Sequence, residues 1–352
     1  MSNHTVAFFG FGKRAINVYV PLLKKLEKYF SVTGFYRRNN DAAEKNAKEF
    51  GIEYFRTPDS LVLASPDIII VSVPVDAQLS ALHALKGFSG TILLDTPIVD
   101  INVVNASREC SSPVGVMEQW PFLPLEQFKK KLYDLSIIER PFLVQNDCRS
   151  YDYHAIAQLR SYLGSNTIPV SAYAMSTGAL LPPHNNMEGI PIQERLLNDI
   201  FDIGIVKMRS GAVINHTFSY PCKISPTRGL QTLRGYSRNG SIITGRRLDK
   251  SNDYEIIDIR FLMGNETISL SPKITRSNNS IISIDAEEFR VKWTNPFPEY
   301  NLRDQDIAIA SVILAAAAGN TYSVTDSYID NLVIQGIKYS SHKNQLVNFG
   351  IE

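Results

Sequence analysis

The residues whose spacing most clearly indicates chemistry lie near the start of the sequence. Gly10, Gly12 and Ala15 form a GxGxxA pattern directly after an apolar run, and Lys13 and Arg14 fall within the same loop. Small residues here let the chain turn, let backbone amides approach a pyrophosphate and keep the following helix close to the strand. The pattern therefore predicts a dinucleotide site at a strand-to-helix turn.

The end of the next apolar run indicates which dinucleotide fits. Arg37 and Arg38 stand where an NAD site would place a carboxylate against the ribose hydroxyls. Two planar guanidinium groups pair well with a 2′-phosphate instead. The sequence favours NADP over NAD, and the alternative is that both arginines simply face solvent. Ser72 and Pro74 end a later apolar run and are expected to contact the same cofactor.

Hydrophobic periodicity predicts the elements that position this loop. In the first part, strands are expected at 5–9, 31–36, 67–73 and 90–95, and helices at 20–28, 41–50 and 78–86. This alternation is typical of a parallel sheet with right-handed crossover helices. Further strands are expected at 141–148, 169–176, 212–222, 254–263, 266–271, 280–285 and 289–293. Further helices are expected at 125–135, 155–163, 193–209, 302–318 and 325–341.

These elements predict an α/β plus α+β protein of two domains. Residues 1–121 form a dinucleotide-binding Rossmann domain with a doubly wound parallel sheet. Residues 122–352 form an α+β domain for substrate binding and oligomerisation, built on a mostly antiparallel sheet. The length of 352 residues also fits two domains better than one.

Composition excludes several classes of protein. The formal net charge is +1, which gives no field to hold nucleic acid or an anionic membrane. No window of about 18 apolar residues occurs. The three cysteines, Cys110, Cys148 and Cys222, are widely spaced, which indicates neither a disulfide framework nor a metal site. We expect a cytoplasmic protein that binds a small molecule.

In order and spacing, the segments resemble the glucose-fructose oxidoreductase, inositol dehydrogenase and MocA (Gfo/Idh/MocA) family. The loop from Gly10 to Ala15 matches the dinucleotide loop of that family. The other matching segments are 71–74, the EKP-like 94–97, the junction-like 120–124, the DxGxH-like 202–206 and the closing helices 317–341. The resemblance implies a nicotinamide-dependent oxidoreductase with Thr96 and Pro97 beside the cofactor. It also implies a homodimer or homotetramer formed through the second-domain sheet.

Two departures from this resemblance affect the proton transfer. The family has a lysine where this sequence has Thr96 and a histidine where it has Val206. The resemblance implies that these two groups hold the substrate oxygen and move its proton. Thr is no acid near neutral pH and Val carries no proton to transfer, so other residues must take this role.

Polar residues elsewhere are candidates for that role. The candidate catalytic residues are Asp95, Tyr153, His154 and Asp202. The candidate substrate-binding residues are Trp120, Arg149, Arg160 and His184. Asp199 and Asp202 would share one helix face at i, i+3 spacing. For His154 and Tyr153, a structural role at a helix start is the alternative, and for Trp120 it is packing.

The sequence leaves three hypotheses for function. The first is an NADP-dependent oxidoreductase that reduces a carbonyl or imine, or oxidises an alcohol, of a small polar metabolite. This metabolite would be sugar-like or a biosynthetic intermediate. The second is a catalytically silent sensor or regulatory partner that keeps the dinucleotide fold, because fold alone does not determine function. The third is a lyase or isomerase that uses NAD without net redox change.

Overall fold

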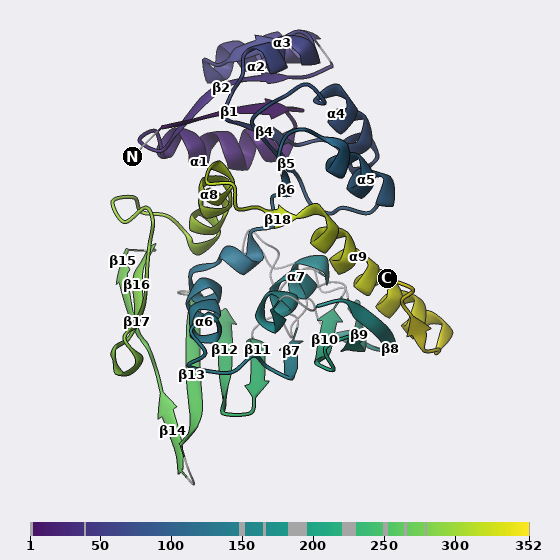
Figure 1. The fold of residues 1–352 in the computed structure, drawn as a ribbon, viewed down its shortest axis with the longest axis vertical. Coiled ribbons are helices and arrows are strands. Elements are labelled where there is room, and N and C mark those ends of the chain that lie inside the picture. The colour runs from purple at the N-terminus through teal and green to yellow at the C-terminus, as the bar shows by residue number, and fades with distance from the viewer. Residues whose placement is uncertain are drawn as a thin grey trace. The chain divides into compact units, whose positions relative to one another are not determined.

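The chain divides into two units in the computed structural model, which describes residues 3–38, 40–147, 152–164, 167–181, 196–219, 230–248, 253–263, 266–278 and 280–351. Unit 1 comprises Met1–Leu123, Asn278–Ser280 and Pro296–Tyr328. Unit 2 comprises Pro124–Ser277, Ile281–Asn295 and Ile329–Glu352. The chain first crosses between the units two residues after the predicted boundary. Residues 296–328, which the sequence placed in the second domain, pack with unit 1 (Figure 1).

Unit 1 is built on a seven-stranded sheet with the strand order β18-β6-β5-β4-β1-β2-β3. Its strands are β1 (His4–Phe9), β2 (Phe30–Tyr36), β3 (Glu53–Phe55), β4 (Ile68–Val71), β5 (Thr91–Leu94), β6 (Val114–Val116) and β18 (Tyr322–Ser323). Strands β1 to β6 are parallel, and β18 is antiparallel to β6. The order 3-2-1-4-5-6 is that of a dinucleotide-binding Rossmann sheet, which confirms the predicted fold of this part.

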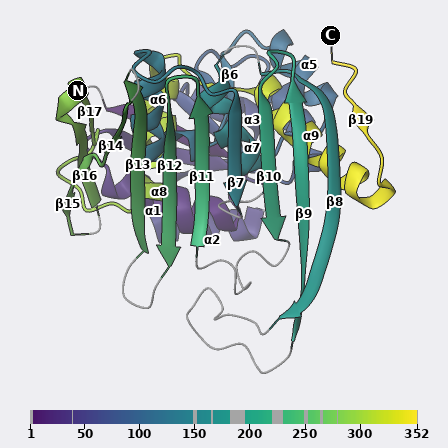
Figure 2. The ribbon, with the colours of Figure 1, turned by 90° about the horizontal axis from the view of Figure 1, so that it is seen from below.

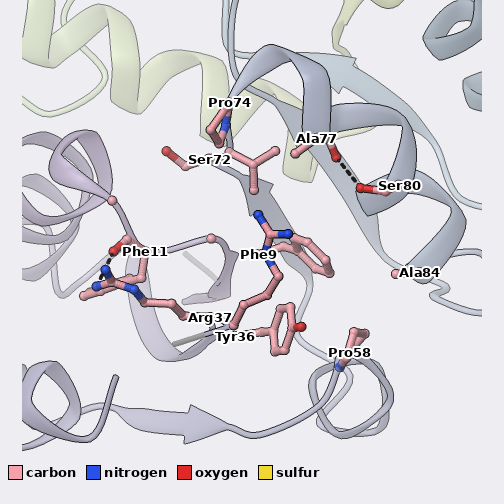
Figure 3. A pocket seen from close by; sticks show the side chains of 14 residues that line it. Phe9, Phe11, Tyr36, Arg37, Pro58, Ser72, Pro74, Ala77, Ser80 and Ala84 are labelled. Atoms are coloured by element: carbon pink, nitrogen blue, oxygen red, sulfur yellow. Dashed lines mark hydrogen bonds between the residues drawn. The ribbon is translucent and has the colours of Figure 1, made fainter. Parts of the chain in front are cut away.

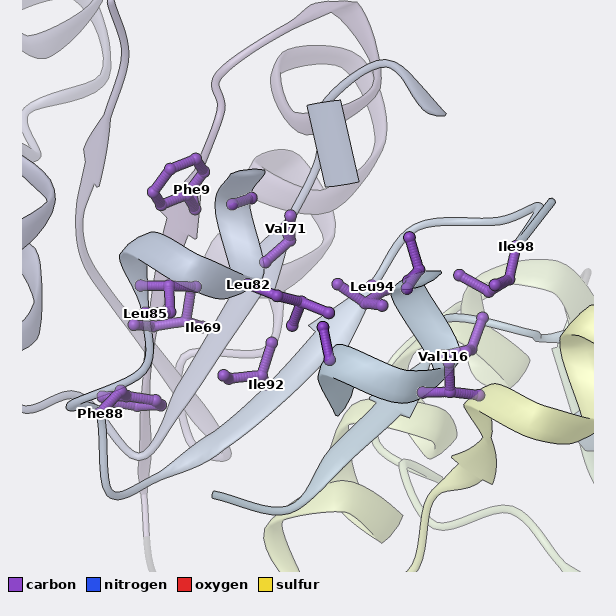
Figure 4. Packing of buried hydrophobic residues seen from close by; sticks show 14 of the residues in the cluster. Phe9, Ile69, Val71, Leu82, Leu85, Phe88, Ile92, Leu94, Ile98 and Val116 are labelled. Carbon is purple, nitrogen blue, oxygen red and sulfur yellow. The ribbon is translucent and has the colours of Figure 1, made fainter. Parts of the chain in front are cut away.

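Helices cover this sheet because its central strands are apolar on both faces. The helices of unit 1 are α1 (Val20–Lys25), α2 (Asn40–Phe50), α3 (Pro58–Leu63), α4 (Gln78–Ala84), α5 (Ile101–Glu109) and α8 (Asp304–Ala317). All four residues of β4 are buried. Figure 4 shows Ile69, Val71 and Leu94 from the strands packed with Leu82 and Leu85 from the α4 region. This core fixes the ends of β1, β4 and β5 relative to one another.

Unit 2 is built on a nine-stranded sheet with the order β14-β13-β12-β11-β7-β10-β9-β8-β19 (Figure 2). Its strands are β7 (Leu143–Asp147), β8 (Pro169–Leu181), β9 (Leu197–Met208), β10 (Val213–Ser219), β11 (Leu230–Ser237), β12 (Gly240–Leu248), β13 (Asp253–Met263), β14 (Glu266–Leu270) and β19 (Val347–Asn348). Neighbouring strands are antiparallel except β7 and β10, which are parallel. This confirms the predicted, mostly antiparallel sheet.

Among the described residues of unit 2, three α-helices and a small sheet accompany the large sheet. The helices are α6 (Pro124–Asp134), α7 (Asp152–Leu163) and α9 (Val324–Lys343), the last of which begins in unit 1. The small sheet contains β15 (Lys273–Ser277), β16 (Ser280–Ala286) and β17 (Val291–Thr294). In the part of the chain that the structure describes, no helix is both long and apolar enough to span a bilayer.

The helix predicted at 193–209 is wrong, because residues Leu197–Met208 form strand β9. From Asp202 to Met208, buried and exposed residues alternate one by one, which is the period of a strand. The strand pairs with β8 on one side and β10 on the other, and these ladders outweigh a local helical spacing. The proposed i, i+3 pairing of Asp199 and Asp202 on a helix face is therefore also wrong.

One face of the β8–β9 ladder is open and apolar. Tyr173 lies opposite Ile205, and Met175 lies opposite Ile203, so all four side chains share a face. Each of them is exposed. Figure 2 views the sheet from this side. The other face of the ladder carries buried residues such as Ala172 and Val206.

Candidate functional site

Two glycines shape the loop between β1 and the first helical turn. Gly10 has a φ of +87°, and a Cβ added there would lie 2.5 Å from the Ser72 carbonyl oxygen. Only glycine fits this conformation and this close approach to the end of β4. At Gly12, in contrast, an added Cβ would meet nothing within 4 Å. Gly12 therefore leaves open space in front of its backbone, as a bound phosphate requires.

A pocket of about 490 Å³ lies next to this loop, between the ends of β1, β2 and β4 (Figure 3). It is lined by Phe9, Gly10, Phe11, Gly12, Tyr36, Arg37, Arg38, Pro58, Ser72, Val73, Pro74, Ala77, Ser80 and Ala84. None of these lining residues is acidic. The volume and the mostly apolar lining with a few polar groups suit part of a cofactor.

The two arginines stand at the β2 end of the pocket. Nη1 of Arg37 donates a hydrogen bond to the Phe11 carbonyl oxygen at 3.3 Å, which connects the arginine to the loop that follows β1 (Figure 3). Arg38 follows it and is exposed. Both guanidinium groups therefore contribute positive charge to a pocket whose described lining residues include no acid. This arrangement suits an anionic group such as a phosphate.

A buried polar network connects the loop helix to the ends of β4 and β5. The hydroxyl of Tyr19 donates to Oδ1 of Asp95 at 2.8 Å and accepts from Nε of Arg14 at 2.7 Å. Nε of Arg14 also lies 3.1 Å from Oδ1 of Asp95. Ser72 Oγ donates to the second carboxylate oxygen at 3.2 Å. Arg14 is thus held by the strand edge rather than extended into solvent.

Burial controls the titration of this network. Burial raises the pKa of Asp95, and the nearby Arg14 charge together with hydrogen bonds from Tyr19 and Ser72 opposes that rise. Burial, followed by the charge of Asp95, also raises the pKa of Tyr19 well above its ordinary value. Tyr19 therefore remains a neutral hydrogen-bond donor to the carboxylate. The sequence singled out Asp95 and Arg14 but missed Tyr19.

The remaining predicted cofactor residues lie at the same edge of unit 1. Ala15 is buried and Lys13 is exposed in the loop helix. Thr96 follows Asp95, and its buried Oγ1 has no hydrogen-bond partner among the described residues. Gln78 Nε2 donates to the Asp95 carbonyl oxygen at 2.8 Å and to that of Pro97 at 3.4 Å, which fixes the backbone on both sides of Thr96.

The predicted catalytic residues other than Asp95 belong to unit 2. Tyr153 and His154 lie in the first turn of α7, with ring centroids 4.3 Å apart, and His154 is buried. Asp202 lies on β9, is buried and accepts a hydrogen bond from Ser176 Oγ. The structure brings these three residues into one unit. Arg149 and His184, predicted to bind substrate, lie outside the described residues.

Two predicted substrate-binding residues have partners within the chain. Arg160 is buried, with Nη1 2.6 Å from an Asp330 carboxylate oxygen, and it donates from Nε to the Thr167 carbonyl oxygen. This ion pair joins α7 to α9. Trp120 is buried in unit 1, where it packs in a small cluster with Leu123 and Ala308. The substrate-binding role expected for both residues stays a prediction.

The sequence missed one histidine in unit 2. His216 lies on β10 and is buried, and its Nδ1 is 2.7 Å from Oδ1 of Asn146 on β7. Burial lowers its pKa to about 4. The signal was present in the sequence, because His216 stands between Ile214 and Phe218 at strand spacing and therefore on the buried face.

Replacing Gly10 by alanine is expected to destabilise unit 1. The new Cβ would contact the Ser72 carbonyl, and alanine disfavours positive φ, so the free energy of unfolding should fall by at least about 2 kcal/mol. Gly12→Ala is the matched control and should change it by less than about 0.5 kcal/mol, because its Cβ has room. Urea denaturation checks both variants; equal stability of the two would contradict this account of the loop.

His216 is expected to make stability depend on pH. Its pKa is about 4 in the folded protein and about 6.5 when unfolded, so between these values the unfolded chain binds more protons. The free energy of unfolding should therefore rise by about 3 kcal/mol between pH 4 and 6.5 from this residue alone. Denaturation of the wild type and of His216→Gln across this range measures the difference. A constant difference between the two would show that His216 titrates normally.

Comparison with known proteins identifies the fold. No family model matches the sequence, and no curated protein is significantly similar to it in sequence. A levoglucosan dehydrogenase in complex with NADH and levoglucosan is 15% identical, with a TM-score of 0.66, over 99% of this chain and 100% of its own. An aldose-aldose oxidoreductase from Caulobacter crescentus is 12% identical, with a TM-score of 0.65, over 99% and 100%.

A third structure with this fold is a super-repressor mutant of Gal80p from Saccharomyces cerevisiae. It is 12% identical, with a TM-score of 0.66, over 99% of this chain and 98% of its own. At such identities the likeness concerns the fold, and it extends over both units. The chain has the fold of the Gfo/Idh/MocA oxidoreductases, as its motifs predicted.

Proposed function

We propose that this protein is an NADP-dependent oxidoreductase that acts on a small polar metabolite. The observation that carries the proposal is the pocket of unit 1. It combines an open loop at Gly12 with two arginines at the end of β2, and none of the described residues that line it is acidic. A dinucleotide with an additional phosphate on its adenosine ribose matches these features.

In this proposal, different residues around the pocket bind different parts of the cofactor. Backbone amides after Gly12, with Lys13 nearby, would bind the pyrophosphate. Arg37 and Arg38 would bind the 2′-phosphate. Ser72 and Pro74 would contact the ribose on the nicotinamide side, where the ends of β4 and β5 meet. The levoglucosan dehydrogenase of the same fold is complexed with NADH, so the preference for NADP rests on the two arginines.

The proposed reaction is the reduction of a carbonyl or imine, or the reverse oxidation. A bound nicotinamide supplies or accepts hydride at its C4 atom. The protein must supply the proton, and Thr96 and Val206 provide no group for this. His154 and Tyr153 remain the candidate proton donors, with Asp202 on the same unit. Asp95 would act by holding Arg14 at the edge of the cofactor pocket.

The substrate is proposed to be sugar-like. Two proteins of the same fold are named for levoglucosan and aldoses. The chain itself supports a polar substrate through the buried polar residues Asn146, Asp202 and His216 in unit 2.

A catalytically silent regulatory protein is the second candidate. Thr96 and Val206 favour it, because both lack a group that could move a proton at the positions where the family resemblance predicts one. One protein of this fold is a super-repressor mutant, Gal80p. Incubation with NADPH and a panel of aldoses and keto acids separates the two candidates. Steady oxidation of NADPH that is lost in His154→Ala supports the enzyme, and binding without any turnover supports the silent protein.

Removing both arginines is expected to abolish the preference for NADP. In Arg37→Ala/Arg38→Ala, the Kd for NADPH should rise at least about 30-fold, because two charge-assisted contacts to phosphate are lost. The Kd for NADH should change less than about threefold. Fluorescence titration with both cofactors measures this, and Arg108→Ala, an exposed arginine on α5, is the control.

Two results would contradict the proposed cofactor. If the wild type shows no saturable binding of NADPH at micromolar concentrations, the proposed function fails. If the Kd values for NADPH and NADH rise by the same factor in the double variant, the arginines maintain the structure of the pocket and do not select the 2′-phosphate. An unchanged melting temperature of the variant is required for either comparison.

The homodimer or homotetramer expected from the sequence stays a prediction. The open face of β8 and β9 is the surface where a second copy would bury Tyr173, Met175, Ile203 and Ile205. A charge at its centre should dissociate the copies, so Ile205→Glu is expected to elute as a monomer. Light scattering measures the molar mass of the wild type and of this variant in solution. Leu63→Glu, at an exposed position of unit 1, is the control and should have the same mass as the wild type. A monomeric wild type would refute the prediction.

A further inference from the structure

A polar cluster on the buried face of the unit 2 sheet has no role in the dinucleotide pocket. We define the His216 cluster as Asn146, Asp152, Asp202, His216 and Lys338. His216 lies opposite Asn146 on β7 and opposite Gly204 on β9, so these positions share one row across three strands. Asp202 occupies the next row, opposite Phe218. Asp152 comes from α7 and Lys338 from α9, both in unit 2.

The hydrogen bond to Asn146 determines which nitrogen of His216 carries the proton. An amide oxygen only accepts hydrogen bonds, so Nδ1 of His216 must donate to Oδ1 of Asn146, 2.7 Å away. The imidazole is neutral at pH 7, because burial keeps its pKa at about 4. In this neutral ring, Nε2 is an acceptor. His216 is therefore a base and not the missing acid of a carbonyl reduction.

Two buried acceptors in the cluster lack a donor. Nε2 of His216 and Oδ1 of Asp152 have no hydrogen-bond partner among the described residues. His216 itself is 1% exposed. Leaving such atoms unpaired costs about 1–3 kcal/mol each, so native proteins normally satisfy them. Nδ2 of Asn146, a donor, also has no partner among the described residues, but Asn146 is not among the residues that line the cavity described below. A group in that cavity, which faces His216 and Asp152, must therefore donate hydrogen bonds.

A small cavity lies between these residues. It has a volume of about 10 Å³, which holds the centre of one water-sized atom, and it is lined by Asp152, Asp202, His216, Phe218, Ile334, Ile337 and Lys338. Lys338 forms an ion pair with Asp152, and its positive charge disfavours a second cation in the cavity. The two carboxylates disfavour an anion. A neutral donor, such as a hydroxyl oxygen, fits both the charge and the size.

We propose that the His216 cluster is a hydroxyl-binding subsite, in which Nε2 of His216 accepts a hydrogen bond from an alcohol of the ligand. The apolar side chains of Phe218, Ile334 and Ile337 pack around that alcohol, as in other pockets with few and well-placed polar groups. Because the subsite offers an acceptor, it selects an alcohol over a carbonyl or an ether oxygen at this position. The proposal rests on the proposed function in one respect, which is that the ligand with this alcohol is taken to be the substrate.

Histidine NMR tests the subsite directly. The protein has six histidines, so ¹⁵N,¹³C-histidine labelling gives few signals, and His216→Gln assigns the one of interest. At pH 7, His216 should show the neutral tautomer protonated at Nδ1. Titration with glycerol and with D-glucose should shift its Nε2 signal saturably, whereas 1,2-dimethoxyethane, which has no O–H, should not shift it. A proton on Nε2, or no shift with either alcohol, would overturn the proposal and leave an ordered water as the occupant.

Binding measurements give a second, independent readout. His216→Phe removes the acceptor and is expected to weaken binding of the effective alcohol about tenfold by calorimetry. His342→Gln, an exposed histidine at the end of α9, is the matched control and should bind normally. His216→Leu, a smaller replacement that also lacks the acceptor, is used if the phenylalanine variant does not fold, and the same loss is expected. Undiminished binding by the folded variants would overturn the proposal.

NADPH titration of the same samples separates this inference from the proposed function. If NADPH binds and no alcohol shifts His216, the subsite is refuted while the cofactor assignment stands. If an alcohol shifts His216 and NADPH does not bind, the proposed function fails and the subsite stands.

Discussion

The pocket of unit 1 depends on the close approach of the Gly10 backbone to the end of β4. A side chain at this position would collide with the Ser72 carbonyl, so the turn exists only because Gly10 has none. This contact places the loop that follows β1 directly beside Ser72, Val73 and Pro74. The loop, the end of β2 and the end of β4 therefore enclose one pocket instead of three separate surfaces.

The Asp95 network shows how such a strand edge stabilises a buried charge. A carboxylate removed from water is costly unless hydrogen bonds and an opposite charge compensate it. Here Tyr19, Ser72 and Arg14 together provide both kinds of compensation. Arg14 is thereby directed along the strand edge, whereas Arg37 and Arg38 line the pocket at the end of β2. The selectivity proposed for the cofactor depends on this division among three arginines.

The parts of the fold that could be predicted are those fixed by local pattern. Strand β4 is recognisable because a parallel strand covered on both faces is apolar throughout. The spacing of Gly10 and Gly12 predicts the loop because backbone chemistry requires glycine there. Strand β9 was missed because its pairing partners determine it, and its carboxylates happen to have helical spacing. The local sequence of a strand does not show which distant strands will pair with it.

The contacts within the sites could not be predicted for the same reason. Tyr19 and Asp95 are 76 residues apart, and Asn146 and His216 are 70 residues apart, so only the fold joins them. The two clusters differ in one physical respect. The carboxylate of Asp95 has donors for both oxygens, whereas His216 and Asp152 each retain a buried acceptor without one. A cluster in which every buried polar atom has a hydrogen-bond partner stabilises the fold. A cluster with unpaired acceptors can still accept a hydrogen bond from a ligand. This difference is why we assign a positioning role to Asp95 and a ligand to His216.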